Sequence, residues 1–74
     1  SNVEDLLELK HSLANLDKEI RSLPHKLKTA LILFVLEGNS QAKCAKILGT
    51  TAKTIESRVS RARKILAKKI VINV

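Results

Sequence analysis

Apolar residues recur at spacings of three and four along the first part of the chain. They are Leu6, Leu9, Leu13, Leu16, Ile20 and Leu23. Such a repeat forms one face of an amphipathic helix, which we expect from about Val3 to Arg21. Two interpretations are open. The face packs against the rest of the domain, or its first half (Leu6, Leu9 and Leu13) docks on a partner chain or a neighbouring domain.

A second helical stretch follows Pro24, because proline ends the preceding helix and suits the first turn of a new one. Its apolar positions follow the i, i+3, i+4, i+7, i+8 spacing of a buried stripe. They are Leu27, Ala30, Leu31, Phe34 and Val35, with Ile32, Leu33 and Leu36 beside them. We expect a helix from Pro24 to Glu37, ended by Gly38, and we expect it to be the most buried helix.

A short helix, a glycine turn and a longer helix fill the rest of the chain. Ser40 is the expected N-cap of a helix over residues 41–48, and Gly49 can take the positive φ of a tight turn. Thr51 is the expected cap of the last helix, which begins near Ala52. Two helices joined by such a turn are typical of helix-turn-helix DNA-binding proteins.

These patterns predict an all-α fold, a small four-helix domain that ends in a helix-turn-helix and has no winged elements. The 74 residues are enough for one small domain. Within it we expect an N-terminal helix, linker or interaction helix over residues 1–22 and the DNA-binding part over residues 23–74. The tail, residues 70–74, either extends the last helix or hangs off it.

Charge is segregated along the chain. Residues 1–22 carry five acids against three basic residues, whereas residues 52–74 carry seven basic residues and one acid, Glu56. The last helix therefore holds +6 of the net charge of +7, which favours a polyanionic partner. The single aromatic residue, Phe34, argues against stacking on single-stranded bases. No apolar run is long enough for a membrane span.

The last helix divides into two faces when its residues are placed at about 100° per residue. Ile55, Val59, Ala62, Leu66 and Ile70 share one narrow arc, which must face the core. Lys53, Ser57, Ser60, Arg61, Lys64 and Lys68 lie opposite. Thr54 and Arg58 flank one edge of this face, and Arg63 flanks the other.

The residues near the start of this helix are the candidates for DNA contact, because the second helix of the motif reads base edges with its N-terminal residues. The predicted base contacts are Lys53, Thr54, Ser57, Arg58 and Arg61. The predicted phosphate contacts are Ser40, Thr51, Arg63, Lys64 and Lys68. A solvated basic face without a nucleic-acid partner is the competing interpretation.

Catalytic chemistry has no support in the sequence. It has no nucleophile–base set, no paired carboxylates and no glycine-rich phosphate loop, so we expect no enzyme, no cofactor and no small-molecule substrate. His11 and His25 stand on different helices without a third ligand, so we expect no metal site. The lone Cys44 fits a small buried side chain and a reducing cytoplasm.

Short matches in a fixed order carry a family resemblance. They are Leu23-Pro24, Glu37-Gly38, Ser40, Ala45, Leu48-Gly49, Thr54-Ile55, Ser57-Arg58 and Arg61-Ala62-Arg63. With these motifs the chain resembles the promoter-reading region 4 of bacterial RNA polymerase sigma factors, and most of all the extracytoplasmic-function group. The likeness covers about Leu16 to Leu66.

The resemblance implies a bacterial cytoplasmic protein that binds the promoter minus-35 element as part of RNA polymerase holoenzyme and directs transcription initiation. It also implies contact with the flap of the polymerase β subunit and often sequestration by an anti-sigma protein. Thr54, Ser57, Arg58 and Arg61 match the family's DNA contacts. Lys43 and Cys44 depart from the family pattern in the short helix, and Glu56 stands where a basic residue is common.

Two other functions remain as alternatives. The first is a different helix-turn-helix regulator, for example of the LuxR type, which shares the turn and the start of the last helix. The second is a sigma-like decoy that binds an anti-sigma protein without touching DNA. A decoy would be free to lose the basic groove residues, and this chain keeps them.

Overall fold

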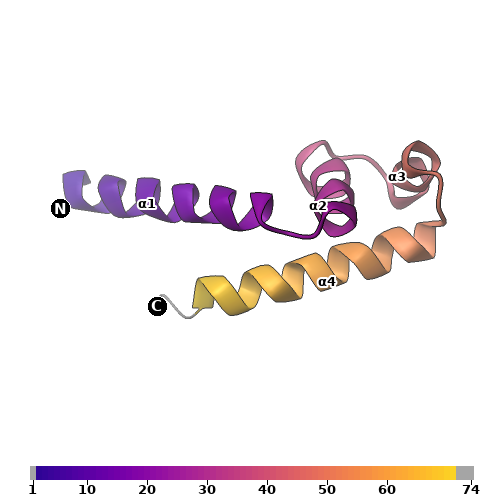
Figure 1. Ribbon diagram of the computed structural model, residues 1–74. Coiled ribbons are helices and arrows are strands. Elements are labelled where there is room, and N and C mark those ends of the chain that lie inside the picture. The colour runs from indigo at the N-terminus through magenta and orange to yellow at the C-terminus, as the bar shows by residue number, and fades with distance from the viewer. Residues whose placement is uncertain (1, 72–74) are drawn as a thin grey trace.

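The computed structural model describes residues 2–71, and the side chains of residues 3–69. Its elements, in chain order, are α1 (Asn2–Arg21), α2 (His25–Leu31), the π-helical turn η1 (Ile32–Leu36), α3 (Gln41–Leu48) and α4 (Ala52–Val71). η1 continues directly from α2, so the described chain forms four helical segments and contains no strand. The predicted all-α four-helix fold is confirmed (Figure 1).

The helix ends lie where the caps predict them. Ser40 Oγ accepts a hydrogen bond from Lys43 N at 3.1 Å, and Thr51 Oγ1 accepts one from Thr54 N at 3.2 Å. These side chains satisfy amides that have no partner inside α3 and α4. Gly38 and Gly49 follow the helices at φ 70° and 68°, a backbone region that other residues adopt at a cost.

The second helix departs from its prediction in its last turn. Glu37 N donates to Ile32 O at 3.0 Å, and this five-residue spacing defines a π turn. Val35, expected in the buried stripe, is 45% exposed, and Leu36 is 65% exposed. α4 packs mainly against α2 and α3. Leu33 and Phe34 of η1 pack against the core, whereas Val35 and Leu36 are left exposed on the same turn.

The expectation that the second helix is the most buried is confirmed when buried and half-buried residues are taken together, since most of residues 25–36 are not exposed, whereas most of α4 is. η1 buries no side chain fully, and α2 buries only Ala30 and Leu31. α4 contributes the largest share of the core because it crosses beneath α2 and α3 and has a helix on each part of its apolar arc (Figure 1).

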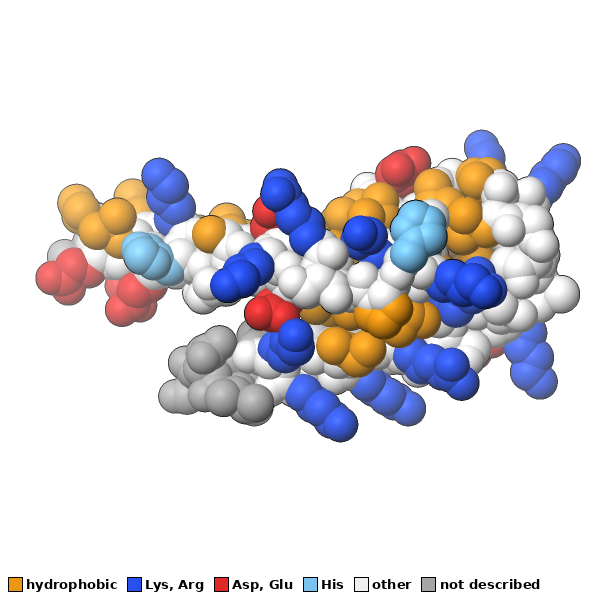
Figure 2. All heavy atoms as spheres, in the orientation of Figure 1, with side chains coloured by type: hydrophobic (Ala, Val, Ile, Leu, Met, Phe, Trp, Pro, Cys, Tyr) orange, Lys and Arg blue, Asp and Glu red, His pale blue; other side chains and the backbone are white. Residues whose placement is uncertain are grey.

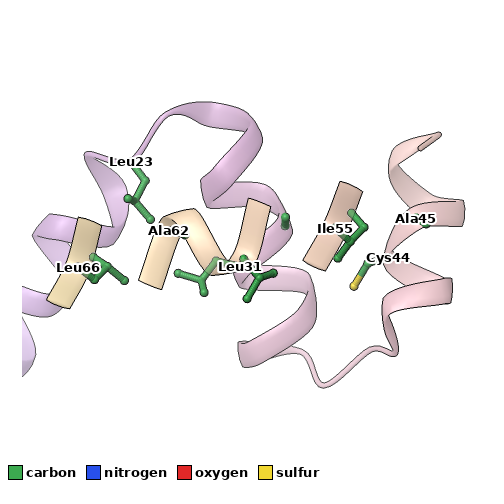
Figure 3. Packing of buried hydrophobic residues seen from close by; sticks show 9 residues of the cluster. Leu23, Leu31, Cys44, Ala45, Ile55, Ala62 and Leu66 are labelled. Carbon is green, nitrogen blue, oxygen red and sulfur yellow. The ribbon is translucent and has the colours of Figure 1, made fainter. Parts of the chain in front are cut away.

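The core is a single cluster of small and medium apolar side chains. Its buried members are Leu23, Ala30, Leu31, Cys44, Ala45, Ile55, Val59, Ala62 and Leu66. Figure 3 shows Ile55 pointing toward Cys44, next to Ala45, where α4 meets α3. The small side chains of α3 let the two helices approach closely. The predicted apolar arc of the last helix is thus confirmed, apart from Ile70, which lies outside the described side chains.

α1 belongs to this core only through its C-terminal end. Ile20 packs against the cluster, and Lys69 Nζ forms an ion pair with Glu19 Oε2 at 2.9 Å, which joins α1 to α4. The N-terminal half of α1 projects past the other helices (Figure 1). Leu6, Leu9 and Leu13, here called the α1 stripe, are each more than half exposed.

Packing within the domain is therefore wrong as an interpretation of the α1 stripe. Docking of the stripe on a partner stays a prediction, as does a division of the chain at residue 22. No helix in the described part of the chain is long and apolar enough to cross a membrane. The last three residues of the predicted tail lie outside the described residues.

Candidate nucleic-acid interface

The outer side of α4 forms a continuous basic surface. Lys53, Ser57, Arg61, Lys64 and Lys68, here called the reading face, are all exposed. They stand opposite the buried arc of Ile55, Val59, Ala62 and Leu66. Figure 2 shows Lys and Arg side chains along the edge of the molecule below α4. Since the core holds the other side of the helix, this face can meet a large partner without any rearrangement.

The turn between α3 and α4 sets the direction in which α4 projects. Gly49 and Thr50 both donate their amides to Ala45 O, the latter at 2.9 Å. These bonds close the end of α3 in the manner of a left-handed glycine cap. Thr51 then starts α4 at once, so that the first turn of α4 is held rigidly to α3. This short link between two packed helices is the helix-turn-helix that the sequence predicts.

The five predicted base contacts do not share one environment. Lys53, Ser57 and Arg61 are exposed on the reading face, whereas Thr54 and Arg58 are half-buried at its edge. The Thr54 hydroxyl also lies 2.9 Å from Thr51 Oγ1, within the cap of α4. The structure thus brings three of the candidates together on the open surface and draws the other two toward the body of the domain.

The predicted phosphate contacts surround this surface. Arg63, Lys64 and Lys68 lie further along α4, and all three side chains are exposed. Ser40 and Thr51 are exposed at the starts of α3 and α4, where their oxygens already cap the backbone. As an acceptor in its cap, Ser40 still has a hydroxyl proton to donate. The hydroxyls of Thr51 and Thr54 share one hydrogen bond in which either can be the donor.

The three residues that depart from the family pattern have clear positions. Glu56 is exposed and lines a shallow groove with Gln41 of α3 and Arg63 of α4. It forms no ion pair or hydrogen bond with any described residue. Lys43 is exposed, and its backbone amide receives the Ser40 cap. Cys44 is fully buried, which confirms its predicted place in the core.

A second feature of the interface was not predicted from the sequence. A cleft lies beside Arg58 of α4 and is lined by residues of α2, of the turn region and of α4. Its lining residues are His25, Lys26 and Thr29 of α2, Leu48, Gly49 and Thr50 of the turn region, and Arg58 of α4. We call this the cationic cleft. Sequence reasoning missed Lys26 because only tertiary packing places α2 beside α4.

Metal-binding chemistry is not indicated anywhere in the described residues, which contain no group of three His, Cys, Asp or Glu side chains placed to hold an ion. The reading face consists of cations and one hydroxyl, and the cleft adds cations, hydroxyls and backbone groups. Such a set binds anions through charge and hydrogen bonds. Fold and surface together define a helix-turn-helix domain in which α4, the second helix of the motif, is basic.

Comparison with known proteins narrows this class. A family model described as "Sigma-70, region 4" matches residues 13–66, and the chain belongs to this family. Over 51 residues it is 43% identical to the ECF RNA polymerase sigma-E factor of Haemophilus influenzae. The resemblance predicted from the short motifs is thus confirmed. The aligned part covers 69% of this chain and 27% of that relative, so the chain spans about a quarter of the relative's length.

Proposed function

We propose that this chain binds the minus-35 element of promoter DNA as part of RNA polymerase holoenzyme and so directs transcription initiation. The observation that supports this most is the reading face, the exposed basic surface of α4, which is the second helix of the helix-turn-helix in a sigma region 4 fold. A protein with this role acts by binding and positioning, without catalysis of its own, and works in the bacterial cytoplasm where DNA and polymerase meet.

In this proposal α4 enters the major groove, whose width suits an α-helix. Lys53, Ser57 and Arg61 stand nearest the base edges, and Arg61 can form the paired hydrogen bonds that arginine makes with guanine. Arg63, Lys64 and Lys68 lie along the phosphates, where they contribute affinity that is independent of sequence. The rigid turn at Gly49 holds the helix at one angle, so little order has to be gained on binding.

A separate surface suits the polymerase. Val35 and Leu36 of η1 and Ile47 of α3 are exposed apolar side chains on two elements that pack together. They lie on elements that cover the inner side of α4, away from the reading face. Exposed apolar groups of this kind mark protein-binding sites. We propose that the β-subunit flap binds here while α4 holds DNA, and that an anti-sigma protein would compete for the same apolar groups.

The alternative functions are less well supported. A LuxR-type regulator does not fit the region 4 match. A decoy that binds only an anti-sigma protein would have no use for a reading face without acids. The exposed side of α4 keeps five basic or hydroxyl side chains in one row, which is costly in self-repulsion unless a polyanion neutralises it.

The test is a selection of random-sequence DNA duplexes on the 74-residue chain, followed by titration of the recovered duplex and of one unrelated duplex. We expect recovery of a common short motif and tighter binding to the selected duplex. Recruitment of the chain by RNA polymerase core enzyme is measured in parallel. Failure to bind either duplex, alone or with core enzyme, would contradict the proposed function.

A further inference from the structure

The cationic cleft has the composition of an anion site. His25, Lys26 and Arg58 line it together with Thr29 and Thr50, and none of its lining residues is acidic. The Thr29 hydroxyl donates to His25 O at 2.8 Å, so it is not a free donor. The two acids that form ion pairs in the described structure, Asp17 and Glu19, pair with Arg21 and Lys69 elsewhere. The positive charge of the cleft is therefore not neutralised within the domain.

The side chains of the cleft also differ from their neighbours in what they contact. Lys28, two residues after Lys26, donates its ammonium to Arg21 O at 3.5 Å and does not line the cleft. Neither Lys26 nor Arg58 forms an ion pair or hydrogen bond with any described residue. The hydroxyl of Thr50 is in the same situation, so the cleft offers several donors that lack a partner.

The position of the cleft relative to the reading face points to the ligand. A helix with its side chains is about 10–12 Å across, which nearly fills a major groove of about 12 Å. With α4 in the groove, the two DNA backbones pass along its two edges. Arg63 lies at one edge. The cationic cleft lies at the other, where Arg58 lines it.

We propose that the cationic cleft binds a phosphate of the DNA backbone strand that borders α4, with Arg58, Lys26 and the Thr50 hydroxyl as donors. This inference rests on the proposed function, and it changes one residue role within it. Arg58 is a phosphate contact and not a base contact, because its half-buried side chain lies along the cleft. The planar guanidinium of arginine suits two phosphate oxygens at once.

The site would give the domain a clamp from two separate helices. α2 contributes Lys26, α4 contributes Arg58, and Gly49 and Thr50 of the turn between α3 and α4 also line the cleft. Phosphate contacts position a protein without reading sequence, so the clamp would fix where Ser57 and Arg61 lie along the groove. For the same reason, Lys26 of α2 would raise the affinity for every duplex, whatever its sequence.

The experiment is a salt titration of DNA binding by the 74-residue chain, with a duplex selected from random sequence and an unrelated duplex as the two probes. Each lost phosphate contact lowers the slope of log affinity against log salt by about 0.9. We expect Lys26→Gln and Arg58→Gln each to lower the slope by about one, equally on both duplexes. Arg58→Lys should retain the slope. Lys28→Gln removes the same charge from α2 outside the cleft and is the matched control.

The outcomes separate the two proposals. Binding by the wild type with unchanged slopes for Lys26→Gln and Arg58→Gln overturns the cleft and leaves the proposed function standing. If Arg58→Gln loses affinity for the selected duplex alone, Arg58 is a base contact, and the proposed phosphate site in the cleft is also overturned. A wild type that binds neither duplex contradicts both. Circular dichroism of each variant shows whether its helices are intact, and Arg58→Lys provides the comparison if Arg58→Gln unfolds.

Discussion

α1 and α4 are two helices of equal length whose apolar stripes meet different surroundings. Each spans 20 residues, and each repeats apolar residues at spacings of three and four. In α4 the stripe is buried from Ile55 to Leu66, whereas the α1 stripe is exposed and only the end of α1 reaches the core. An apolar repeat thus predicts which side of a helix is apolar, but not whether another element covers it.

The same two helices differ in charge in a way that matches this packing. The exposed side of α4 is basic, and its first turn holds no acid. α1 begins with Glu4 and Asp5, and Figure 2 shows acidic side chains gathered at that end of the molecule. α4 therefore presents a cationic surface and is held in place by the core, whereas α1 presents apolar groups flanked by acids.

The largest difference between the helices should appear in stability. Ile55 is fully buried between α3 and α4, so Ile55→Ala removes its contacts and leaves a cavity, at a cost of about 2–5 kcal/mol. We expect the variant to be largely unfolded, since a domain of this size has little stability to lose. Urea denaturation followed by circular dichroism measures the effect. A loss below about 1 kcal/mol would show that the core closes around the gap.

The next effect concerns DNA binding. Arg61→Ala should weaken binding to a selected duplex by about 1–3 kcal/mol if Arg61 reads a base, with a much smaller loss on unrelated DNA. Lys10→Ala on α1 is the control, because it removes one charge far from the reading face. Fluorescence anisotropy at fixed salt compares them. An equal loss on both duplexes would instead assign Arg61 to a phosphate.

A smaller effect is expected at the start of α4. Thr51→Ala removes the oxygen that accepts from Thr54 N and should cost about 0.5–2 kcal/mol of folding stability. Ser12→Ala, in the exposed middle of α1, should be neutral or slightly stabilising, because alanine is the better helix former. Thermal unfolding of the two variants side by side gives the comparison. Equal effects would mean that Thr51 contributes little as a cap.

The smallest effect should come from the α1 stripe. Leu6→Ala should change the free energy of unfolding by no more than about 0.5 kcal/mol, as expected of an exposed position. A loss near that of Ile55→Ala would show that the stripe is covered in solution. Repeating the denaturation at several protein concentrations would then reveal whether a second copy covers it, since dimer stability depends on concentration.

Much of the fold could be predicted because its signals are local. Pro24, Gly38 and Gly49 mark the ends of helices, and Ser40 and Thr51 are capping residues with observed capping bonds. These depend on a few neighbouring backbone groups, so a short stretch of sequence is enough. The π turn at Ile32–Leu36 escaped prediction, because its apolar residues suit an ordinary helix equally well.

The candidate interface was predictable only in part. The reading face follows from the opposition of Arg61 and Lys64 to a buried arc on the same helix, which periodicity alone reveals. The cationic cleft joins Lys26 to Arg58, residues far apart in sequence. No spacing rule connects them, because their approach depends on how α2 packs across α4.

By itself, the sequence determined the four helices, their caps, the apolar arc of α4 and the family to which the chain belongs. Only the tertiary structure decided which apolar residues are covered. It left Leu6, Val35 and Leu36 exposed, and it placed Lys26 beside Arg58. The physical reason is that helix formation and capping depend on groups a few residues apart, whereas burial depends on which distant helix happens to lie over each face.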